Sequence, residues 1–463
     1  MVASLDFQAM PDIPDLAAFR DAERALLQRW PETRLDPSLV RIAALCDLLG
    51  QPQRAYPVVH LTGTNGKTST ARMVDNLLRG LGLRTGRFTS PHLESITERI
   101  AIDGEPLTQQ RFVEVYAEVA PYAEIVDRSG GHPVSFFELM TAMGFAAFTD
   151  APVDAAVIEV GMGGTWDSTN VADASVAIVT PIGVDHSRYL GDSAADIADE
   201  KAGILKPGTF AVLAQQAVEV AEVLLRRAAE VGATVAREGF EFGVVDRTPG
   251  VGGQLVTFQG LGATYADVFL PLYGAHQAHN AAYALAAVEA FAGGKGLDGG
   301  LDNEVVREAF GLVTSPARLE IIRRSPTVVL DAAHNPHGAH ALVEAVQESF
   351  SFSPLIGVVG VMEDKDVGGL LDAFEPIMAT IVCTQNSTAR AMPAAELAEV
   401  ARGVFGGDRV EVAARLDDAL DVATGLADSA GPDSVGLGGA GVLVTGSVIT
   451  AGEARHLLGG GRP

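Results

Sequence analysis

Short apolar runs alternate with helical patterns along most of the chain. Continuous apolar runs at Val58–Thr62, Ala155–Val160 and 175–180 are typical of strands buried on both faces of a parallel sheet. Apolar residues spaced three and four apart predict helices over 12–30, 37–49, 70–81, 133–149, 194–204 and 277–291. This alternation predicts an α/β protein with a doubly wound sheet.

A second series of the same kind follows a linker that we place near Val313–Pro316. Apolar runs predict strands near 327–331, 355–361, 379–384, 409–413 and 441–446, with helical patterns between them. Residues 232–273 differ, because their glycines and β-forming residues predict a small antiparallel patch. We therefore expect two domains, 1–313 and 314–463, the second a smaller Rossmann-like α/β domain.

Composition and charge narrow the classes of protein that fit. The chain has 463 residues, of which 48% are hydrophobic and 20% charged, which suits a globular protein of more than one domain. The net charge of −26 argues against nucleic-acid and anionic-membrane partners, so an anionic ligand needs locally positive loops. The two cysteines form no disulfide framework, and the N-terminus lacks the pattern of a signal peptide. We expect a cytoplasmic protein.

The most informative motif follows the first buried strand. The run Gly63-Thr64-Asn65-Gly66-Lys67-Thr68 leads directly into a helical pattern. Backbone N–H groups of such a loop surround phosphates, the lysine adds a positive charge, and the hydroxyl after it can hold Mg²⁺. Because Leu61 stands where the common phosphate loop has its first glycine, this loop is shorter than usual. The strand–loop–helix context disfavours a chance glycine-rich turn, so we interpret the first domain as a P-loop-type, doubly wound ATPase domain.

Polar residues follow two further strands of the first domain. Glu159 ends a buried strand before a glycine-rich segment, which suits a Mg²⁺ ligand, although a strand-edge glutamate is the alternative. Asp185 and His186 follow the next strand, at the end where α/β sheets build their sites. Lys201 lies in a helical pattern, and from physics alone it is a surface lysine paired with a neighbour.

The second domain offers its own polar residues close to the linker. Asp331 ends the first strand of this domain, where a carboxylate could hold a ribose or a base. The alternative is an ordinary turn with an Asn-Pro signal at Asn335. Arg318 follows the linker directly and could reach a phosphate across the cleft between the domains.

These motifs occur together and in a fixed order, which identifies a family resemblance. The set comprises Gly63–Thr68, Arg87–Leu93, Glu98–Ile100, Glu159–Gly164, Asp167–Asn170, Asp185-His186, Glu200–Ile204, His279–Ala282 and Asp331–Pro336. The chain resembles folylpolyglutamate synthases, in particular the bacterial bifunctional dihydrofolate synthases/folylpolyglutamate synthases of the Mur ligase superfamily. The resemblance spans roughly residues 35–455, and Phe88–Leu93 is the run most specific to the folate branch.

The resemblance implies an ATP-dependent acid–amino-acid ligase. Such an enzyme phosphorylates a substrate carboxylate to an acyl phosphate, which the amine of L-glutamate attacks. The acceptor would be dihydropteroate, the glutamate tail of (tetrahydro)folates, or both. Positioning and neutralisation of negative charge would supply most of the catalysis. The implied cofactors are ATP, two Mg²⁺ ions and a CO₂-derived carbamate on Lys201, and the implied state is a monomer.

The resemblance also implies roles for individual residues. ATP would contact Gly63, Thr64, Asn65, Gly66, Lys67, Thr68, Asn280, Arg318 and Asp331. Metal ligands would be Ser90, Glu159, His186 and the carbamate of Lys201, and Lys201 and His334 would be catalytic. The pterin would lie against Ser135, Phe136, Phe137, Glu138, Trp166, Asp167 and Ser168, because an aromatic pair offers a flat heterocycle a stacking surface. Ser447 is a candidate for the glutamate site.

One departure from the family keeps an alternative open. Many relatives carry Arg-Leu-Asp where this chain has Thr165-Trp166-Asp167, so folylpolyglutamate synthase activity alone is the first alternative. A cell-wall Mur ligase is a weaker one, because too few residues precede the phosphate loop for a domain that binds a UDP group. A nucleotide switch is disfavoured because we find no Asn-Lys-x-Asp base-reading motif.

Overall fold

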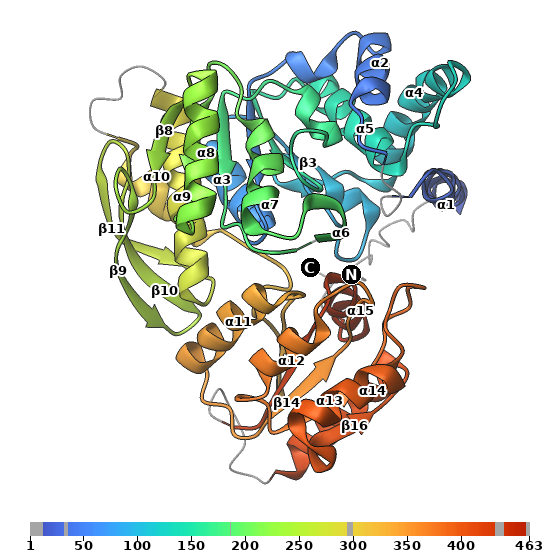
Figure 1. The fold of residues 1–463 in the computed structure, drawn as a ribbon, viewed down its shortest axis with the longest axis vertical. Helices are drawn as coiled ribbons and strands as arrows, with labels where there is room; N and C mark the ends of the chain where they lie inside the picture. Colours follow the sequence, from blue (N-terminus) through green and yellow to red (C-terminus); the bar gives the residue numbers. More distant parts are fainter. Residues whose placement is uncertain (1–12, 32–35, 186, 294–299, 431–438, 460–463) are drawn as a thin grey trace, which may run out of the picture.

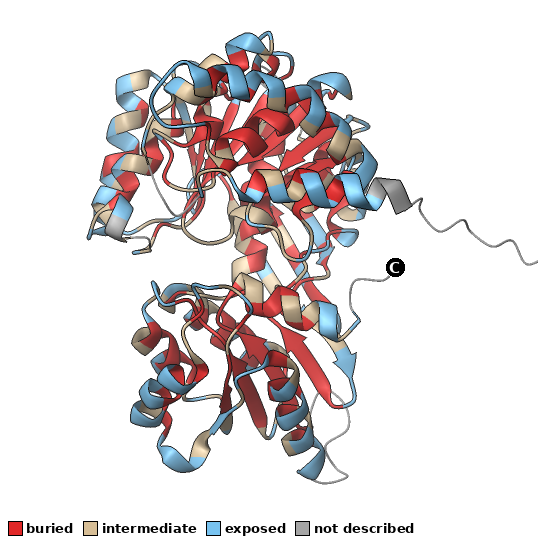
Figure 2. Ribbon diagram, turned by 90° about the vertical axis from the view of Figure 1, so that its right-hand side faces the viewer, coloured by how far each residue is buried: buried red, intermediate tan, exposed pale blue. Residues whose placement is uncertain are grey.

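The protein forms two α/β lobes stacked along its long axis (Figure 1). The computed structural model describes residues 13–31, 36–185, 187–293, 300–430 and 439–459. Buried strands form the centre of each lobe, and helices with exposed outer faces cover them (Figure 2). The predicted α/β class, with one main sheet in each lobe, is confirmed.

The first lobe is built on an eight-stranded sheet of order β4-β3-β2-β5-β1-β6-β7-β8. All neighbours from β2 to β8 are parallel, and β3 and β4 extend the sheet as antiparallel edge strands. The strands are β1 Val58–Thr62, β2 Thr85–Phe88, β3 Ile100–Ile102, β4 Glu105–Pro106, β5 Ala155–Glu159, β6 Val176–Val179, β7 Phe210–Leu213 and β8 Thr234–Arg237. The central strands β1 and β5 are buried throughout, as their continuous apolar runs predict.

Helices cover both faces of this sheet. They are α1 Ile13–Leu27, α2 Val40–Leu48, α3 Lys67–Gly80, α4 Gln109–Arg128, α5 Phe136–Asp150, α6 Ser187–Leu190, α7 Ala194–Lys201, α8 Val218–Val231, α9 Ala275–Gly293 and α10 Asn303–Gly311. Alternate residues of a strand point to opposite faces, so Val59 joins the core under α3, α9 and α10, whereas Val58 joins the core under α4 and α5. Short 3₁₀ turns lie at Pro52–Arg54, Ile96–Arg99, Ser168–Val171, Ala202–Ile204 and Gly407–Arg409.

A three-stranded antiparallel sheet of order β11-β10-β9 flanks the first lobe. Its strands are β9 Gly243–Gly250, β10 Gly253–Gln259 and β11 Thr264–Leu270. The antiparallel patch predicted over 232–273 is confirmed for these strands but wrong for β8, which pairs in parallel with β7. The reason is the helix α8 between them, which makes the crossover that parallel neighbours require.

The second lobe contains a six-stranded sheet of order β12-β13-β17-β14-β15-β16. The strands are β12 Glu320–Arg324, β13 Thr327–Leu330, β14 Leu355–Val359, β15 Thr380–Cys383, β16 Val410–Val412 and β17 Gly441–Thr445. The helices are α11 Pro336–Ser349, α12 Val367–Phe374, α13 Ala394–Phe405, α14 Leu416–Ser429 and α15 Val448–Leu457. The five predicted strands are confirmed, whereas the antiparallel edge strand β12 is an addition that the apolar pattern does not predict.

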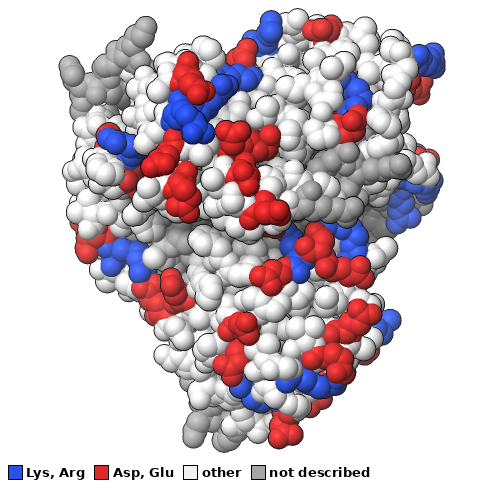
Figure 3. All heavy atoms as spheres, viewed as in Figure 1, with Lys and Arg blue, Asp and Glu red and all other residues white. Residues whose placement is uncertain are grey.

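Two whole-molecule properties bear on partners. Within the described residues, every helix is too short or too polar to cross a bilayer. Acidic side chains are spread over both lobes and interspersed with basic ones on the face seen in Figure 3, which carries no broad basic surface.

Candidate active site

A large cavity lies where the two lobes meet. Its volume is about 1150 Å³, and its walls come from segments that follow β2, β5 and β6 in the first lobe and β13, β14 and β17 in the second. Carboxyl ends of parallel strands are where α/β proteins build their sites. The cavity therefore joins the catalytic edges of both sheets.

The predicted phosphate loop connects β1 to α3 beside this cavity. Gly63 and Gly66 adopt positive φ, and a Cβ on Gly63 would overlap the Thr180 side chain, so the backbone path requires glycine there. The Lys67 ammonium curls back over the loop and donates to the carbonyls of Gly63 and Thr64 at 3.1 and 3.2 Å. A positive charge thus lies at the N-terminus of α3, which already favours anions.

Glu159 stands at the buried end of β5, next to the loop. Thr68 Oγ1 donates to both of its carboxylate oxygens at 2.9 and 3.0 Å, and the Ser90 N–H lies 3.4 Å from Oε2. Burial raises the pKa of Glu159, and the Lys67 charge opposes that rise. Carboxylate and hydroxyl oxygens are the ligands that Mg²⁺ prefers, so these residues fit a Mg²⁺ ion.

The second expected metal ligand cannot be placed. His186 lies outside the described residues. The residues that the structure does describe gather no group of three or more His, Cys, Asp or Glu that could hold a metal ion. The metal roles of Ser90, Glu159, His186 and Lys201 therefore stay predictions.

Lys201 ends α7 and is buried, so the expectation of a surface lysine is wrong. The helix turns Ile197, Ala198 and Lys201 inward, and only 4% of Lys201 is exposed. Its Nζ makes no hydrogen bond or ion pair with any described residue, since the carboxylate of neighbouring Glu200 accepts from backbone N–H groups of the loop after β5. Burial and the nearby Lys67 charge lower the pKa of Lys201 to about 7. An amine that is partly unprotonated at neutral pH is a competent nucleophile toward CO₂.

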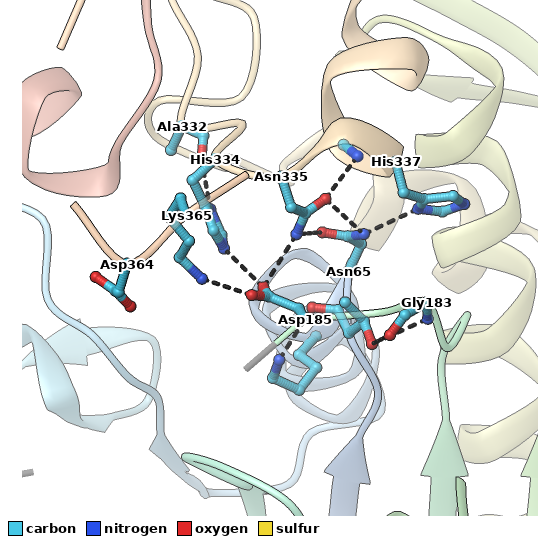
Figure 4. Close-up of polar contacts among 12 residues, drawn as sticks. Asn65, Gly183, Asp185, Ala332, His334, Asn335, His337, Asp364 and Lys365 are labelled. Carbon is cyan, nitrogen blue, oxygen red and sulfur yellow. Dashed lines mark hydrogen bonds and ion pairs between the residues drawn. The ribbon is translucent and has the colours of Figure 1, made fainter. Parts of the chain in front are cut away.

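Asp185 joins the two lobes through a network of polar contacts (Figure 4). Lys365 Nζ lies 2.6 Å from Asp185 Oδ1, Asn335 Nδ2 donates to Oδ2 at 3.2 Å, and His334 Nε2 lies 3.6 Å from Oδ2. Asn65 of the phosphate loop exchanges amide hydrogen bonds with Asn335. The phosphate loop and the second lobe are thus directly connected.

Lys365 is a residue that sequence reasoning misses. It follows β14 in the loop before α12, and its side chain is only 10% exposed. Its position after an apolar run, among acidic neighbours Glu363, Asp364 and Asp366, is the only signal in the sequence.

The expected nucleotide residues outside the loop surround α3 and the linker. Asn280 of α9 packs so closely on Gly66 that a Cβ there would overlap its amide. Asp331 accepts from the backbone N–H groups of Leu319 and Ala333 at 3.0 and 2.8 Å, which fixes the start of the second lobe. Arg318 donates to the Ala317 carbonyl and lines a small cavity beside Thr68.

The expected pterin wall is divided between cavity and core. Ser135 caps α5 in a reciprocal capping box with Glu138, which also pairs with Arg41. The large cavity is lined by Ser135, Phe137, Glu138, Trp166, Asp167 and Ser168. Phe136 is not part of this lining, because it is buried in the core. The Arg99 guanidinium lies over the Phe136 ring, with its Cζ 4.9 Å from the ring centre. The two phenylalanines therefore do not form a common stacking surface.

The glutamate candidate lies on the opposite wall. Ser447 lines the large cavity and caps α15 by accepting from the Ile449 N–H at 3.1 Å. Ser447 and the start of α15 thus border the space between the lobes.

Comparison with known proteins gives the architecture a class. Residues 137–288 match the Mur ligase middle domain, and residues 317–448 match the Mur ligase glutamate ligase domain. The curated dihydrofolate synthase/folylpolyglutamate synthase of Mycobacterium tuberculosis is 52% identical over 97% of this chain and 96% of its own. The structure of M. tuberculosis folylpolyglutamate synthase complexed with ADP superposes with a TM-score of 0.92 at 51% identity, covering 97% of this chain and 99% of that one. E. coli FolC in complex with DHPP and ADP gives a TM-score of 0.82 at 28% identity, covering 96% and 98%.

The fold, the short phosphate loop and the cavity between the lobes thus define an ATP-dependent ligase of the Mur type. Identity above half over nearly the full length then fixes the branch. The chain belongs to the dihydrofolate synthase/folylpolyglutamate synthase family.

Proposed function

We propose that this chain joins L-glutamate to dihydropteroate and to the glutamate tail of reduced folates, through an acyl phosphate made with ATP. The observation that carries the proposal is the composition of the cavity. One side is lined by Asn335 and His337, which contact Asn65 of the phosphate loop, and the other side is a wall with Phe137 and Trp166. Relatives with ADP or DHPP bound support both halves of this assignment.

The proposed roles follow from where the charges lie. Lys67 and the loop N–H groups hold the ATP phosphates, with Asn280, Arg318 and Asp331 as further nucleotide contacts. Ser90 and Glu159 hold one Mg²⁺, and His186 with a carbamate on Lys201 holds a second. A bound Mg²⁺ supplies a Lewis acid for phosphoryl oxygens. The partly neutral amine of Lys201 supports carbamate formation, because CO₂ reacts with the unprotonated form.

The second lobe contributes the amine side of the reaction in this proposal. His334 lies 3.6 Å from Asp185 at the junction, next to the phosphate loop, and Ser447 faces the same cavity. We assign the ATP step to residues 1–313 and the glutamate step to 314–463. We further propose that the protein is a cytoplasmic monomer. Size-exclusion chromatography with light scattering tests its oligomeric state.

A second candidate is folylpolyglutamate synthase activity alone. Trp166 favours it, because this ring lines the cavity where many relatives have leucine and so changes the shape of the acceptor wall.

An ADP-release assay decides between these functions. Purified protein is incubated with ATP and Mg²⁺, with dihydropteroate or tetrahydrofolate as acceptor, each with and without L-glutamate. Release that requires glutamate with both acceptors supports the bifunctional enzyme, and release with tetrahydrofolate alone supports the second candidate. Release without any acceptor, or none with either acceptor, contradicts both.

A further inference from the structure

A second, smaller cavity lies beside the phosphate loop and is lined by two arginines. Its volume is about 40 Å³, and its polar lining comprises Thr68, Arg72, Thr89, Glu98, Ser315 and Arg318. A single water needs about 10–15 Å³ of such space, so this cavity holds a group of only a few heavy atoms. Pro91 and Val448 line both cavities, which makes the small one a side chamber of the large one.

Arg72 reaches this chamber from the helix that follows the phosphate loop. Thr68 and Arg72 are four residues apart on α3 and therefore share one face of the helix. Side chains on a helix lean toward its N-terminus, so the Arg72 guanidinium extends back toward the loop rather than away from it.

Neither arginine of the chamber makes an ion pair with a described carboxylate, although the charge of Arg318 opposes the rise that burial causes in the pKa of Asp331 and of Glu159. Arg72 makes no hydrogen bond or ion pair with any described residue, and Arg318 donates only to the carbonyl of Ala317. The acidic groups nearest to Arg72 are already engaged: Asp75 pairs with Arg87, and Glu98 accepts from the backbone N–H groups of residues 93–95.

Such an arrangement is unfavourable unless an anion completes it. Burial, followed by the charge of Arg87, lowers the pKa of Arg72 to about 10, which leaves the guanidinium charged at neutral pH. A partly buried cation without a partner raises the free energy of the folded protein. Two arginines and one carboxylate, Glu98, whose oxygens already accept backbone hydrogen bonds, leave this chamber with an excess of positive charge, which indicates a site for an anion of matching size.

We propose that Arg72 and Arg318 together bind the α- or β-phosphate of the nucleotide in this chamber. The inference rests on the proposed ATP-dependent function and adds Arg72 to the nucleotide site. Guanidinium groups present two parallel N–H donors that match phosphate oxygens, and two of them can hold one phosphate from two sides. The same chemistry would accept inorganic phosphate released by the reaction, so the experiment separates the two sources.

The test compares Arg72→Gln and Arg72→Lys with the wild-type chain by isothermal titration calorimetry. The probes are ADP, AMP, adenosine and orthophosphate. We expect Arg72→Gln to weaken ADP binding by about tenfold or more, because hydrogen bonds to charged groups are lost, while adenosine binding is unchanged. Arg72→Lys keeps the charge but loses the two parallel N–H donors, so its affinity for ADP should lie between those of the wild type and Arg72→Gln. AMP weakened as much as ADP assigns the chamber to the α-phosphate, and AMP unchanged assigns it to the β-phosphate.

The matched control is Arg79→Gln on the same helix. The Arg79 guanidinium donates to the Asp103 carbonyl and lies outside the chamber, so all four probes should bind as in wild type. Unchanged melting temperatures without ligand show that the variants fold. If Arg72→Gln does not fold, ADP binding is compared between Arg72→Lys and the wild type.

Two results would overturn the inference. One is ADP binding by Arg72→Gln equal to wild type. The other is a loss confined to orthophosphate, which would make the chamber a site for the product. If the wild-type chain ligates glutamate with ATP in either case, the proposed function stands and only the role of Arg72 fails. If the wild type releases no ADP with acceptor and glutamate, the function fails instead.

Discussion

Replacing Lys201 by methionine tests whether this buried lysine is a neutral amine in the folded protein. Burial holds the pKa of Lys201 at about 7, against an ordinary value of 10.5, so the unfolded chain binds more protons between these two pH values. Stability must then rise with pH across this window. Integrating the difference gives a cost to the wild-type fold of about 4 kcal/mol at pH 7 and about 1 kcal/mol at pH 10.

Lys201→Met removes the titrating group and keeps most of its volume. In CO₂-free buffer the variant should be more stable than wild type by about 4 kcal/mol at pH 7 and by only about 1 kcal/mol at pH 10. Urea unfolding followed by circular dichroism measures both values. Lys206→Met is the matched control: its ammonium donates to the carbonyls of Asn170 and Ala172, so this variant should lose stability at both pH values.

Substitutions at Lys201 also test the carbamate. Bicarbonate should stabilise the wild type and leave Lys201→Met unaffected, because only an amine can take up CO₂. Ligation should nearly vanish in Lys201→Ala and return in part with added short-chain carboxylates, which supply the missing oxygen ligands. A gain in stability for Lys201→Met that is equal at pH 7 and pH 10 would refute the neutral amine. Absent rescue, together with an unmodified lysine in a high-resolution map, would refute the carbamate.

Further substitutions test the walls of the site and the junction between the lobes. Phe137→Ala should raise KM for the acceptor with little loss of stability. Phe136→Ala should cost about 3 kcal/mol of stability and leave KM for the acceptor unchanged. Equal effects of the two substitutions on KM in steady-state kinetics would contradict this division. Gly161→Ala places a Cβ against the Phe137 ring, so KM for the acceptor should rise while KM for ATP does not, and an unchanged acceptor KM would count against the wall. Lys365→Met should lower the free energy of unfolding, measured with urea, by about 3 kcal/mol, because it removes the ammonium beside the Asp185 carboxylate. In a double-mutant cycle with Asp185→Asn, strict additivity would disprove the pairing.

The sequence predicts best what is encoded over a short stretch. The loop Gly63–Thr68 is recognisable because a strand, two glycines and a helix start fall within a few residues. Burial of Lys201 is not recognisable from the sequence, because α7 is short and its inward face is defined only by the loop after β5 that packs against it. Lys365 and Asp185 are 180 positions apart, and no local pattern indicates that they meet. Which of Phe136 and Phe137 faces the cavity depends on the exact residue at which α5 begins.

The placement of positive charge explains why the reaction needs both lobes. The chain carries a net charge of −26, yet Lys67 of the first lobe and Arg318 and Lys365 of the second converge on the phosphate loop. These cations are partly buried, so salt and water screen them less than exposed charges, while the acidic surface is screened beyond about 10 Å. Each lobe alone supplies only part of the charge that an ATP phosphate chain and an acyl phosphate require. In the proposed reaction, the acceptor is therefore activated only when the lobe that delivers glutamate is already in contact, which protects the acyl phosphate from hydrolysis.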